Sequence, residues 1–560
     1  MAVFIIIAIV VILLLLRGVS ENARNREKRK EALKKSFGAF SSRTYGYDEF
    51  ERIRSSLKFS KAKENEFVID EITATDINLD ELYKKINISC SQMGDEFLYR
   101  ILHRPVNSET ILEQRHAAAE ILREDEELRA ELMLCLNNMG RVSGRGLGST
   151  IEKLDTVRQE SNLLHFTCIA AALIAIVFIF IRPAVGFVLT FPVLFFNVFT
   201  YFKRKGEIGD ELNAFAYIFN CLSQAKSLTK INAKGLEEYF EQISETVAFF
   251  KKITLNSFIL FAGRSLTGNL LSLPLDYIRI VFHLDLIKFN NSLKFVLENR
   301  ERLLELLDTI GFLDASISVA SLRKALKSWC TPQLTDDNTL DIDGLYHPMI
   351  ADAVPYDIKT SRGVLVTGSN ASGKSTFLRA AALACLLGET IYTVPAHRAA
   401  FPFSRIYSSM AVNDSITGGD SLYMAEIKAV KRIIDAAEDG NLSIKTICFL
   451  DELLRGTNTV ERIAASSRIL KELSETGALV FAATHDIELT DILSERLDNF
   501  HFKESIENGS IRFDYTLEEG PARSRNAIAL LRMLGFDERI TLDAFAEAEG
   551  FEKKKVWSKI

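Results

Sequence analysis

Long apolar runs occur at three places in the first 202 residues. Fifteen apolar residues run from Ala2 to Leu16. Two uncharged 19-residue stretches, Leu163 to Ile181 and Ala184 to Phe202, are joined only by Arg182-Pro183. A helix of about 20 apolar residues is long enough to cross the hydrocarbon core of a bilayer. The pattern predicts an N-terminal transmembrane anchor and, later in the chain, a transmembrane helical hairpin.

Basic residues next to these runs predict their orientation. Between Arg17 and Lys35 lie eight Lys or Arg against three Glu, and Lys203-Arg204-Lys205 follows the hairpin. Because basic flanks tend to stay cytoplasmic, we expect three spans of the cell membrane, with the N-terminus outside and the chain after Phe202 in the cytoplasm. A cleaved signal peptide is the alternative for the first run, and buried core helices are the alternative for the hairpin.

The remaining apolar positions up to about residue 340 recur at helical spacing. They do so from Ile69 to about Leu154 and again from Gly206 to about Ser328, where Phe289 to Asp314 reads as one long amphipathic helix. By itself this spacing predicts a helical bundle. The segment from Ser36 to about Asn65 is polar and reads as a linker or a short helical arm.

After residue 340 the pattern changes to short apolar strands that alternate with helical segments. One expected strand begins at Val364, a second ends at Leu450 and a third covers Ala478 to Ala483. Phe502 to Tyr515 reads as a β-hairpin around Asn508-Gly509. Strands that alternate with helices are typical of an α/β domain with a parallel sheet.

The loop after the first of these strands has the spacing G-x-x-x-x-G-K-[ST]. Its glycines let backbone N–H groups surround a phosphate, Lys374 supplies a positive charge, and the Ser375 hydroxyl suits Mg²⁺. A glycine-rich turn without function is the alternative. The residues expected to hold ATP phosphates are Gly368, Ser369, Asn370, Ala371, Ser372, Gly373, Lys374, Ser375 and Thr376.

Polar residues also follow the next two strands. Asp451 and Glu452 end the strand at Leu450, and Thr484-His485-Asp486 follows Ala483. Because the carboxyl ends of parallel strands meet at one edge, we expect Asp451 to support Mg²⁺ with Ser375, Glu452 to activate water and His485 to sense the γ-phosphate. The alternatives are a helix start for the two carboxylates and a surface position for the histidine.

Composition restricts the partners. The 560 residues are 48% hydrophobic with a mean hydropathy of +0.08, a net charge of −6 and a pI near 5.9. No global positive field therefore attracts nucleic acid, and DNA binding would require a local basic patch. Seven scattered cysteines without a C-x-x-C pair argue against a disulfide framework and a zinc site.

Five segments together resemble the ATPase domain of the MutS family, in the family's order. They are TGSNASGKST, ITGGDSLYMAEI, LDELLRGTNTVE, ATHD and EEGPARSRNAIALLRMLG. Ile86 to Leu122 also resembles the opening of the MutS core domain. The resemblance implies an α/β P-loop ATPase domain of the MutS/ABC-like type, preceded by an all-α MutS-like core that here contains transmembrane helices.

The resemblance also implies individual roles. Ser421 matches a serine that reaches the partner subunit's nucleotide, so it implies a homodimer with composite ATP sites. Tyr356 and Tyr515 fall near positions where family members stack aromatic rings on adenine. Arg455-Gly456-Thr457 matches a turn that couples the two sites. The loop departs from the family's usual form at Ser369 and at Ala371-Ser372.

These observations predict the following organisation. We expect a transmembrane anchor at 1–20, a basic linker at 21–65, a MutS-like helical core at 66–160 and 206–340 interrupted by the hairpin at 163–202, and the ATPase domain at 341–560. Because about 65 residues precede the core, we expect the family's mismatch-reading domain to be absent.

The expected function is that of a membrane-anchored ATP-driven switch with its ATPase domain in the cytoplasm. The first hypothesis is that the core binds mismatched or branched DNA. The second is that the switch acts on a membrane protein partner without DNA. A transporter is a weaker third, because three spans per chain leave little room for a translocation path.

Overall fold

The structure is a computed structural model, and it describes residues 24–59, 66–141, 151, 154, 161–254, 272–369, 372–410, 422–438, 444–507, 510–522, 528, 531, 535–554 and 556–557. The chain forms two compact units, each described below by itself. The helical unit comprises Met1–Lys61, Tyr83–Arg100 and Ala117–Ala325, and the α/β unit comprises Ala62–Leu82, Ile101–His116 and Leu326–Ile560. The predicted anchor at 1–20 lies outside the described residues.

The helical unit contains α-helices throughout its described part, as the spacing predicts. The chain passes from one unit to the other within three helices, which are α4 (Leu79–Ile86), α5 (Gln92–Leu102) and α6 (Glu109–Glu124). The helices that lie wholly within the unit are α2 (Tyr47–Phe59), α7 (Glu126–Met139), α9 (Leu163–Ile181), α10 (Pro183–Glu207), α11 (Gly209–Leu228), α12 (Glu237–Thr254), α14 (Ser272–Val281), α15 (Leu284–Glu298) and α16 (Arg300–Ala325).

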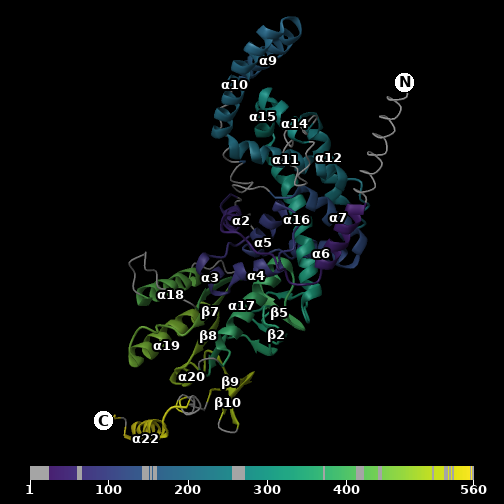
Figure 1. The fold of residues 1–560 in the computed structure, drawn as a ribbon. Coiled ribbons are helices and arrows are strands. Elements are labelled where there is room, and N and C mark those ends of the chain that lie inside the picture. The colour runs from purple at the N-terminus through teal and green to yellow at the C-terminus, as the bar shows by residue number, and fades with distance from the viewer. Residues whose placement is uncertain are drawn as a thin grey trace. The chain divides into compact units, whose positions relative to one another are not determined.

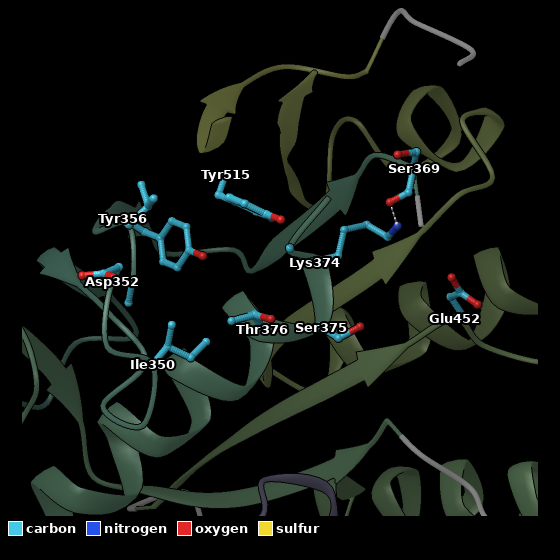
Figure 2. A pocket seen from close by; sticks show the side chains of 12 residues that line it. Ile350, Asp352, Tyr356, Ser369, Lys374, Ser375, Thr376, Glu452 and Tyr515 are labelled. Carbon is cyan, nitrogen blue, oxygen red and sulfur yellow. Dashed lines mark hydrogen bonds between the residues drawn. The ribbon is translucent and has the colours of Figure 1, made fainter. Parts of the chain in front are cut away.

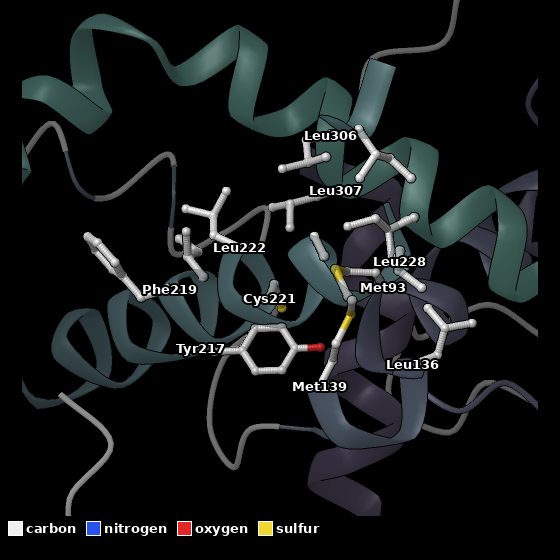
Figure 3. Packing of buried hydrophobic residues seen from close by; sticks show 14 of the residues in the cluster. Met93, Leu136, Met139, Tyr217, Phe219, Cys221, Leu222, Leu228, Leu306 and Leu307 are labelled. Carbon is white, nitrogen blue, oxygen red and sulfur yellow. The ribbon is translucent and has the colours of Figure 1, made fainter. Parts of the chain in front are cut away.

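One apolar cluster joins these helices. Along α16 the buried positions Leu303, Leu307 and Ile310 repeat every three or four residues, so one face of the helix packs into the core. Figure 3 shows Leu306 and Leu307 facing the side chains that α5, α7 and α11 contribute. The predicted amphipathic helix from Phe289 to Asp314 is divided between α15 and α16, which meet at Asn299.

A buried ion cluster lies within the same unit. The Asp95 side chain is fully buried and accepts hydrogen bonds from Arg43 Nη1 at 2.8 Å, Arg141 Nε at 2.6 Å and Asn87 Nδ2 at 2.9 Å. Burial opposes its charge, but the hydrogen bonds and charges of Arg141 and Arg43 hold the pKa of Asp95 below its usual range. These contacts join α5 to Arg43 and Asn87, which precede it in the chain, and to Arg141, which follows α7. A single carboxylate therefore holds three segments of the unit together.

The α9–α10 hairpin carries the predicted apolar surface. Both helices are long and apolar enough to cross a membrane, by length and composition. Their outer side chains are exposed, among them Phe180 at 83% and Phe191 at 76%. The two helices approach closely at Gly186, where a Cβ would lie 2.3 Å from the backbone nitrogen of Ile179. In Figure 1 the hairpin projects from the other helices of its unit.

Polar contacts hold the other end of the hairpin. Asn197 Nδ2 donates to the carbonyls of Cys168 at 3.0 Å and Val281 at 2.9 Å. Nearby, the Tyr201 hydroxyl donates to Asp285 Oδ2 at 2.8 Å. The hairpin therefore has a buried polar base and an exposed apolar remainder, which is the distribution expected if only the remainder meets lipid.

The α/β unit contains a six-stranded sheet in the order β10-β9-β4-β8-β7-β6. The five neighbouring strands β6, β7, β8, β4 and β9 are parallel, and β9 pairs antiparallel with β10. The strands are β4 (Val364–Thr367), β6 (Ser404–Ser409), β7 (Lys445–Asp451), β8 (Leu479–Thr484), β9 (Asp498–Glu507) and β10 (Ser510–Glu519). The predicted hairpin is thus present and begins at Asp498 instead of Phe502.

Alternate strand residues face opposite sides of this sheet. Leu365, Leu450 and Val480 pack in one cluster with helices α18 (Leu422–Glu438), α19 (Thr459–Glu475) and α20 (Glu488–Ile492). On the other face, Phe481 stacks with Phe449 at 5.2 Å between ring centroids and contacts Phe377 of α17 (Lys374–Ile391). Because both faces are covered, the central strands β4, β7 and β8 are mainly apolar, as in other parallel sheets.

A second sheet and two early segments of the chain complete the α/β unit. The second sheet has the order β1-β5-β2-β3. Residues 62–82, which include α3 (Glu71–Asp76), and residues 101–116 also belong to this unit, so the expected first part of the core at 66–160 is divided between the units. The second sheet consists of β1 (Gln333–Thr335), β2 (Leu340–Leu345), β3 (Tyr356–Thr360) and β5 (Arg398–Pro402), and α22 (Glu538–Lys554) is the last helix.

Candidate functional site

The glycine-rich loop lies between β4 and α17, where the sequence predicts it. Gly368 and Gly373 have φ values of 150° and 114°, a region that side chains with a Cβ rarely adopt. A Cβ at Gly373 would also lie 3.4 Å from the rings of Phe502 and Tyr515. Glycine is therefore needed at both ends of the loop to let the backbone turn into the N-terminus of α17.

Lys374 is the first residue of α17 and points back over the loop. Its Nζ donates hydrogen bonds of 2.8 Å to the carbonyl oxygens of Gly368 and Ser369, the second of which is drawn in Figure 2. The side chain is buried, and its ammonium lies above the N-terminal end of a helix. Backbone N–H groups and a lysine charge at one place make this loop suitable for an anion with several oxygens.

Ser375 and Asp451 are adjacent although 76 residues separate them in the chain. The Ser375 hydroxyl donates a hydrogen bond to Asp451 Oδ2, which brings the start of α17 to the end of β7. Burial raises the pKa of Asp451, and the Ser375 hydrogen bond opposes this shift. A hydroxyl and a carboxylate side by side provide two oxygen ligands of the kind that Mg²⁺ prefers.

Glu452 follows Asp451 and has an unusual backbone conformation. Its φ is +53°, and its N–H donates to the carbonyl of Ala483 at 2.9 Å, which fixes it against the end of β8. The carboxylate lies 3.5 Å from His485 Nδ1 and 3.8 Å from Arg455 Nη1. Left-handed backbone at a non-glycine residue is found preferentially at functional sites, where the surrounding structure holds it in place.

A cavity of about 480 Å³ opens beside the loop. This volume is within the range of small-molecule sites. In Figure 2 the rings of Tyr356 and Tyr515 lie on one side of Lys374, and Glu452 lies on the other. The lining residues are Ile350, Asp352, Ala353, Val354, Tyr356, Ser369, Gly373, Lys374, Ser375, Thr376, Glu452 and Tyr515.

The two tyrosines differ in environment. Tyr356 is buried, and its ring contacts Phe377 and Phe502 edge-on at 5.4 and 5.9 Å between centroids. Burial raises the pKa of Tyr356 to about 12, so its hydroxyl stays neutral. Tyr515 is 43% exposed and has a φ of +53° at an irregularity in the β9–β10 pairing. One ring is therefore a fixed wall, and the other is a partly exposed cover.

The structure places most of the predicted site residues together, with three outside the described residues. Gly368, Ser369, Ser372 to Thr376, Asp451, Glu452 and His485 surround one edge of the sheet, whereas Asn370, Ala371 and Ser421 are not described. The sequence reasoning missed the segment Ile350 to Val354, which lines the cavity before β3. Its nearness to Tyr356 in the chain was the only signal that pointed to it.

The residues present fit a magnesium-bound nucleotide. Among the described residues no group of three or more His, Cys, Asp or Glu is arranged to hold a metal alone, so a cation would need further oxygen ligands. Mg²⁺ commonly takes one or two protein oxygens together with phosphate and water. The Ser372 hydroxyl is buried in the loop and has no hydrogen-bond partner among the described residues, which leaves a donor for a phosphate oxygen.

Comparison with known proteins gives the same family as the motifs. A family model for MutS domain V matches residues 364–552. The DNA mismatch repair protein MutS 2 of Haloarcula marismortui is 31% identical over 287 residues, which cover 45% of this chain and 30% of that protein. Residues 364–552 are thus similar to domain V of the MutS family. A second relative, the DNA mismatch repair protein MutS of Thermus aquaticus, is 34% identical to this chain over 205 residues, or 36% of the chain and 25% of that protein.

The match is confined to part of each relative. The aligned region covers 30% of the Natronomonas pharaonis MutS as well, at 31% identity. The chain thus spans about a third or less of the curated relatives it matches. The domain V match includes the glycine-rich loop, Asp451, Glu452 and His485, so the residues that form the site lie inside the shared region.

Proposed function

We propose that this chain binds ATP with Mg²⁺ in the cavity beside the glycine-rich loop and hydrolyses it to ADP and phosphate. The observation that carries the proposal is the contact between Ser375 and Asp451, with Glu452 next in the chain. This contact joins the loop that would hold phosphates to the strand end that would hold the cation and the general base. The match to MutS domain V supports the same assignment.

Some residues of the site would bind the nucleotide, and others would take part in proton transfer. Lys374 would exchange its two carbonyl partners for phosphate oxygens, and Ser375 with Asp451 would hold Mg²⁺. When bound, Mg²⁺ would neutralise charge on the phosphates. Glu452 would accept a proton from the attacking water, and His485, 3.5 Å from Glu452, would respond to the terminal phosphate. Tyr356 and Tyr515 would flank the adenine ring.

The site is proposed to be completed by a second copy of the chain. Ser421, by its family resemblance, would reach the nucleotide of the partner subunit. We expect that Ser421→Ala and Lys374→Ala chains, each inactive alone, recover about a quarter of the wild-type ATPase rate when they are mixed, because some mixed dimers hold one intact composite site. Phosphate release in the mixture measures this, with each parent alone as its control. A mixture as inactive as its parents would contradict a shared site.

The α9–α10 hairpin is proposed to lie in the membrane. Its exposed apolar side chains and its basic end at Lys203-Arg204-Lys205 support a hairpin whose two ends face the cytoplasm. With an N-terminal span at 1–20, the chain would cross the cell membrane three times, with its N-terminus outside and its ATPase domain in the cytoplasm.

ATP is proposed to act as a switch for DNA held by the helical core, because the relatives carry names of DNA mismatch repair proteins. In detergent or nanodiscs we expect mismatched or branched duplex DNA to change the ATPase rate at least about twofold. DNA binding should also weaken steeply with salt, because phosphate contacts release counterions.

Homoduplex DNA and the Lys374→Ala variant are the controls for this experiment. Clear ATP turnover that no DNA alters would contradict the DNA proposal. It would favour the second candidate, a switch that acts on a membrane protein partner, which the exposed apolar hairpin supports.

A further inference from the structure

A buried carboxylate outside the glycine-rich loop is linked to Glu452 through polar contacts. Asp76 is the last residue of α3 and is 2% exposed. Its Oδ2 accepts hydrogen bonds from the Ser408 hydroxyl at 2.7 Å and from the Met410 N–H at 2.8 Å. Asp76 therefore holds the end of β6, at the same edge of the sheet as Asp451.

The contacts continue from Met410 to the site. The carbonyl oxygen of Met410 accepts a hydrogen bond from Arg455 Nη2 at 3.2 Å. Arg455 Nη1 in turn lies 3.8 Å from Glu452 Oε2, and Arg455 Nε lies 3.5 Å from Glu426 Oε1. One residue, Met410, thus has its N–H fixed by Asp76 and its carbonyl engaged by the arginine that pairs with Glu452.

A third contact joins Asp76 to the helix that begins at Lys374. The Arg379 Nε donates to the backbone carbonyl of Asp76 at 2.8 Å. Arg379 lies on α17, slightly more than one turn after Lys374 and Ser375. The end of α3 is therefore tied to the loop helix on one side and to the strand end near Glu452 on the other.

We infer that Asp76 is a positioning residue that sets the place of the Glu452 carboxylate through Met410 and Arg455. The inference rests on the proposed ATP hydrolysis and adds to it a residue from the early part of the chain. The buried Asp76 carboxylate accepts hydrogen bonds from two donors, which fixes its position. Arg455 is 43% exposed, so its guanidinium needs a fixed acceptor to stay near Glu452.

The inference also gives a route for regulation of hydrolysis. The chain leaves the α/β unit at Leu82, shortly after Asp76, and enters the helical unit at Tyr83. A shift of α3 along this covalent connection would move Asp76 and, through Met410, the partner of Glu452.

The test uses the full chain and compares Asp76→Ala with Asp70→Ala. Asp70 caps the same helix through the Thr73 N–H and pairs with Arg432, but it does not contact Met410. We expect Asp76→Ala to lower kcat at least about tenfold with KM for ATP within about twofold, because misplacing a catalytic group affects the chemical step. Asp70→Ala should lower kcat by less than about twofold.

Two further measurements separate positioning from a loss of structure. Asp76→Asn keeps the shape and one acceptor oxygen, so it should recover most of kcat. In a Glu452→Gln background, Asp76→Ala should lower the residual rate by less than about twofold, because its effect passes through Glu452. Equal losses from Asp70→Ala and Asp76→Ala, or a full tenfold effect in the Glu452→Gln background, would overturn the inference.

A measurement without nucleotide keeps the inference distinct from the proposed function. Hydrogen exchange should accelerate at residues 404–410 and 451–457 in Asp76→Ala, and in Asp70→Ala it should stay at the wild-type rate at 451–457. If the wild type shows no ATP turnover but this pattern appears, the proposed function fails and the link to Glu452 stands. If the wild type hydrolyses ATP and Asp76→Ala alters neither exchange at 451–457 nor kcat, the inference fails alone.

Discussion

Glu452→Gln is expected to stop ATP turnover while leaving ATP bound. The amide cannot accept a proton from water, and removal of a general base costs about 100- to 10,000-fold in rate. Glutamine has the same shape, and the phosphate-binding groups Lys374 and Ser375 are unchanged. We therefore expect kcat, measured by phosphate release, to fall at least about 100-fold, with the Kd for a fluorescent ATP analogue within about threefold of wild type.

Glu472→Gln is the matched control for this change. Glu472 is an exposed glutamate on α19 in the same α/β unit, so its loss removes one negative charge without touching the cavity. It should leave kcat unchanged. Undiminished turnover in Glu452→Gln would show that another group accepts the proton, and loss of ATP binding would show that Glu452 supports the phosphate site instead.

Asp95→Ala is expected to destabilise the helical unit by roughly 3–5 kcal/mol. The change leaves the guanidinium groups of Arg43 and Arg141, both largely removed from solvent, without the carboxylate that they share. Arg43 keeps its ion pair with Glu49, so the main cost is the charge of Arg141, which loses the carboxylate that offsets it. Hydrogen exchange at the amides of α5 should accelerate at least about 100-fold, because each 1.4 kcal/mol corresponds to a factor of ten.

The control for Asp95 is Asp308→Ala, which removes an exposed ion pair with Arg100. Exposed pairs contribute roughly 1 kcal/mol or less, so protection of α5 should change by less than about fivefold. Equal effects of the two variants would contradict the role given to the buried cluster.

The buried cluster around Asp95 is also expected to make the stability of the helical unit sensitive to acid. Because the folded pKa of Asp95 lies below its ordinary value near 3.8, its contribution to stability is complete above that value and is lost as the pH falls through the folded pKa. In wild type, protection of α5, corrected for the intrinsic exchange rate, should therefore fall below about pH 4. Asp95→Ala should lack this part of the acid loss.

The α/β site was predictable from the sequence to the extent that its parts are contiguous. The loop from Gly368 to Ser375 would bind phosphate through backbone groups, so its glycine spacing is enough to indicate the proposed chemistry. Asp451 and His485 were predicted because each follows a buried strand, and parallel strands bring their carboxyl ends to one edge. The two long apolar helices α9 and α10 were likewise predicted from length and apolar content, and the structure contains both; their place in a membrane stays a prediction.

Other parts of the site arise from segments that are distant in the chain. No local pattern marks Asp76, because its neighbours in sequence are an ordinary short helix and its partners lie more than 300 residues later. The cavity wall from Ile350 to Val354 carries no motif either. The early segments 62–82 and 101–116 have the same helical spacing as the core, so periodicity could not show that they belong to the α/β unit.

By itself, the sequence determined the class of each part: apolar spans, a helical bundle and an α/β domain with a phosphate-binding loop. These follow from local physics, since strand and helix periods, glycine at left-handed φ and a lysine at a helix start act over a few residues. The tertiary structure alone decided that Ile350 to Val354 line the cavity and that Asp76 holds the strand end beside Glu452. Such contacts depend on the order of strands in the sheet, which residue spacing along the chain does not encode.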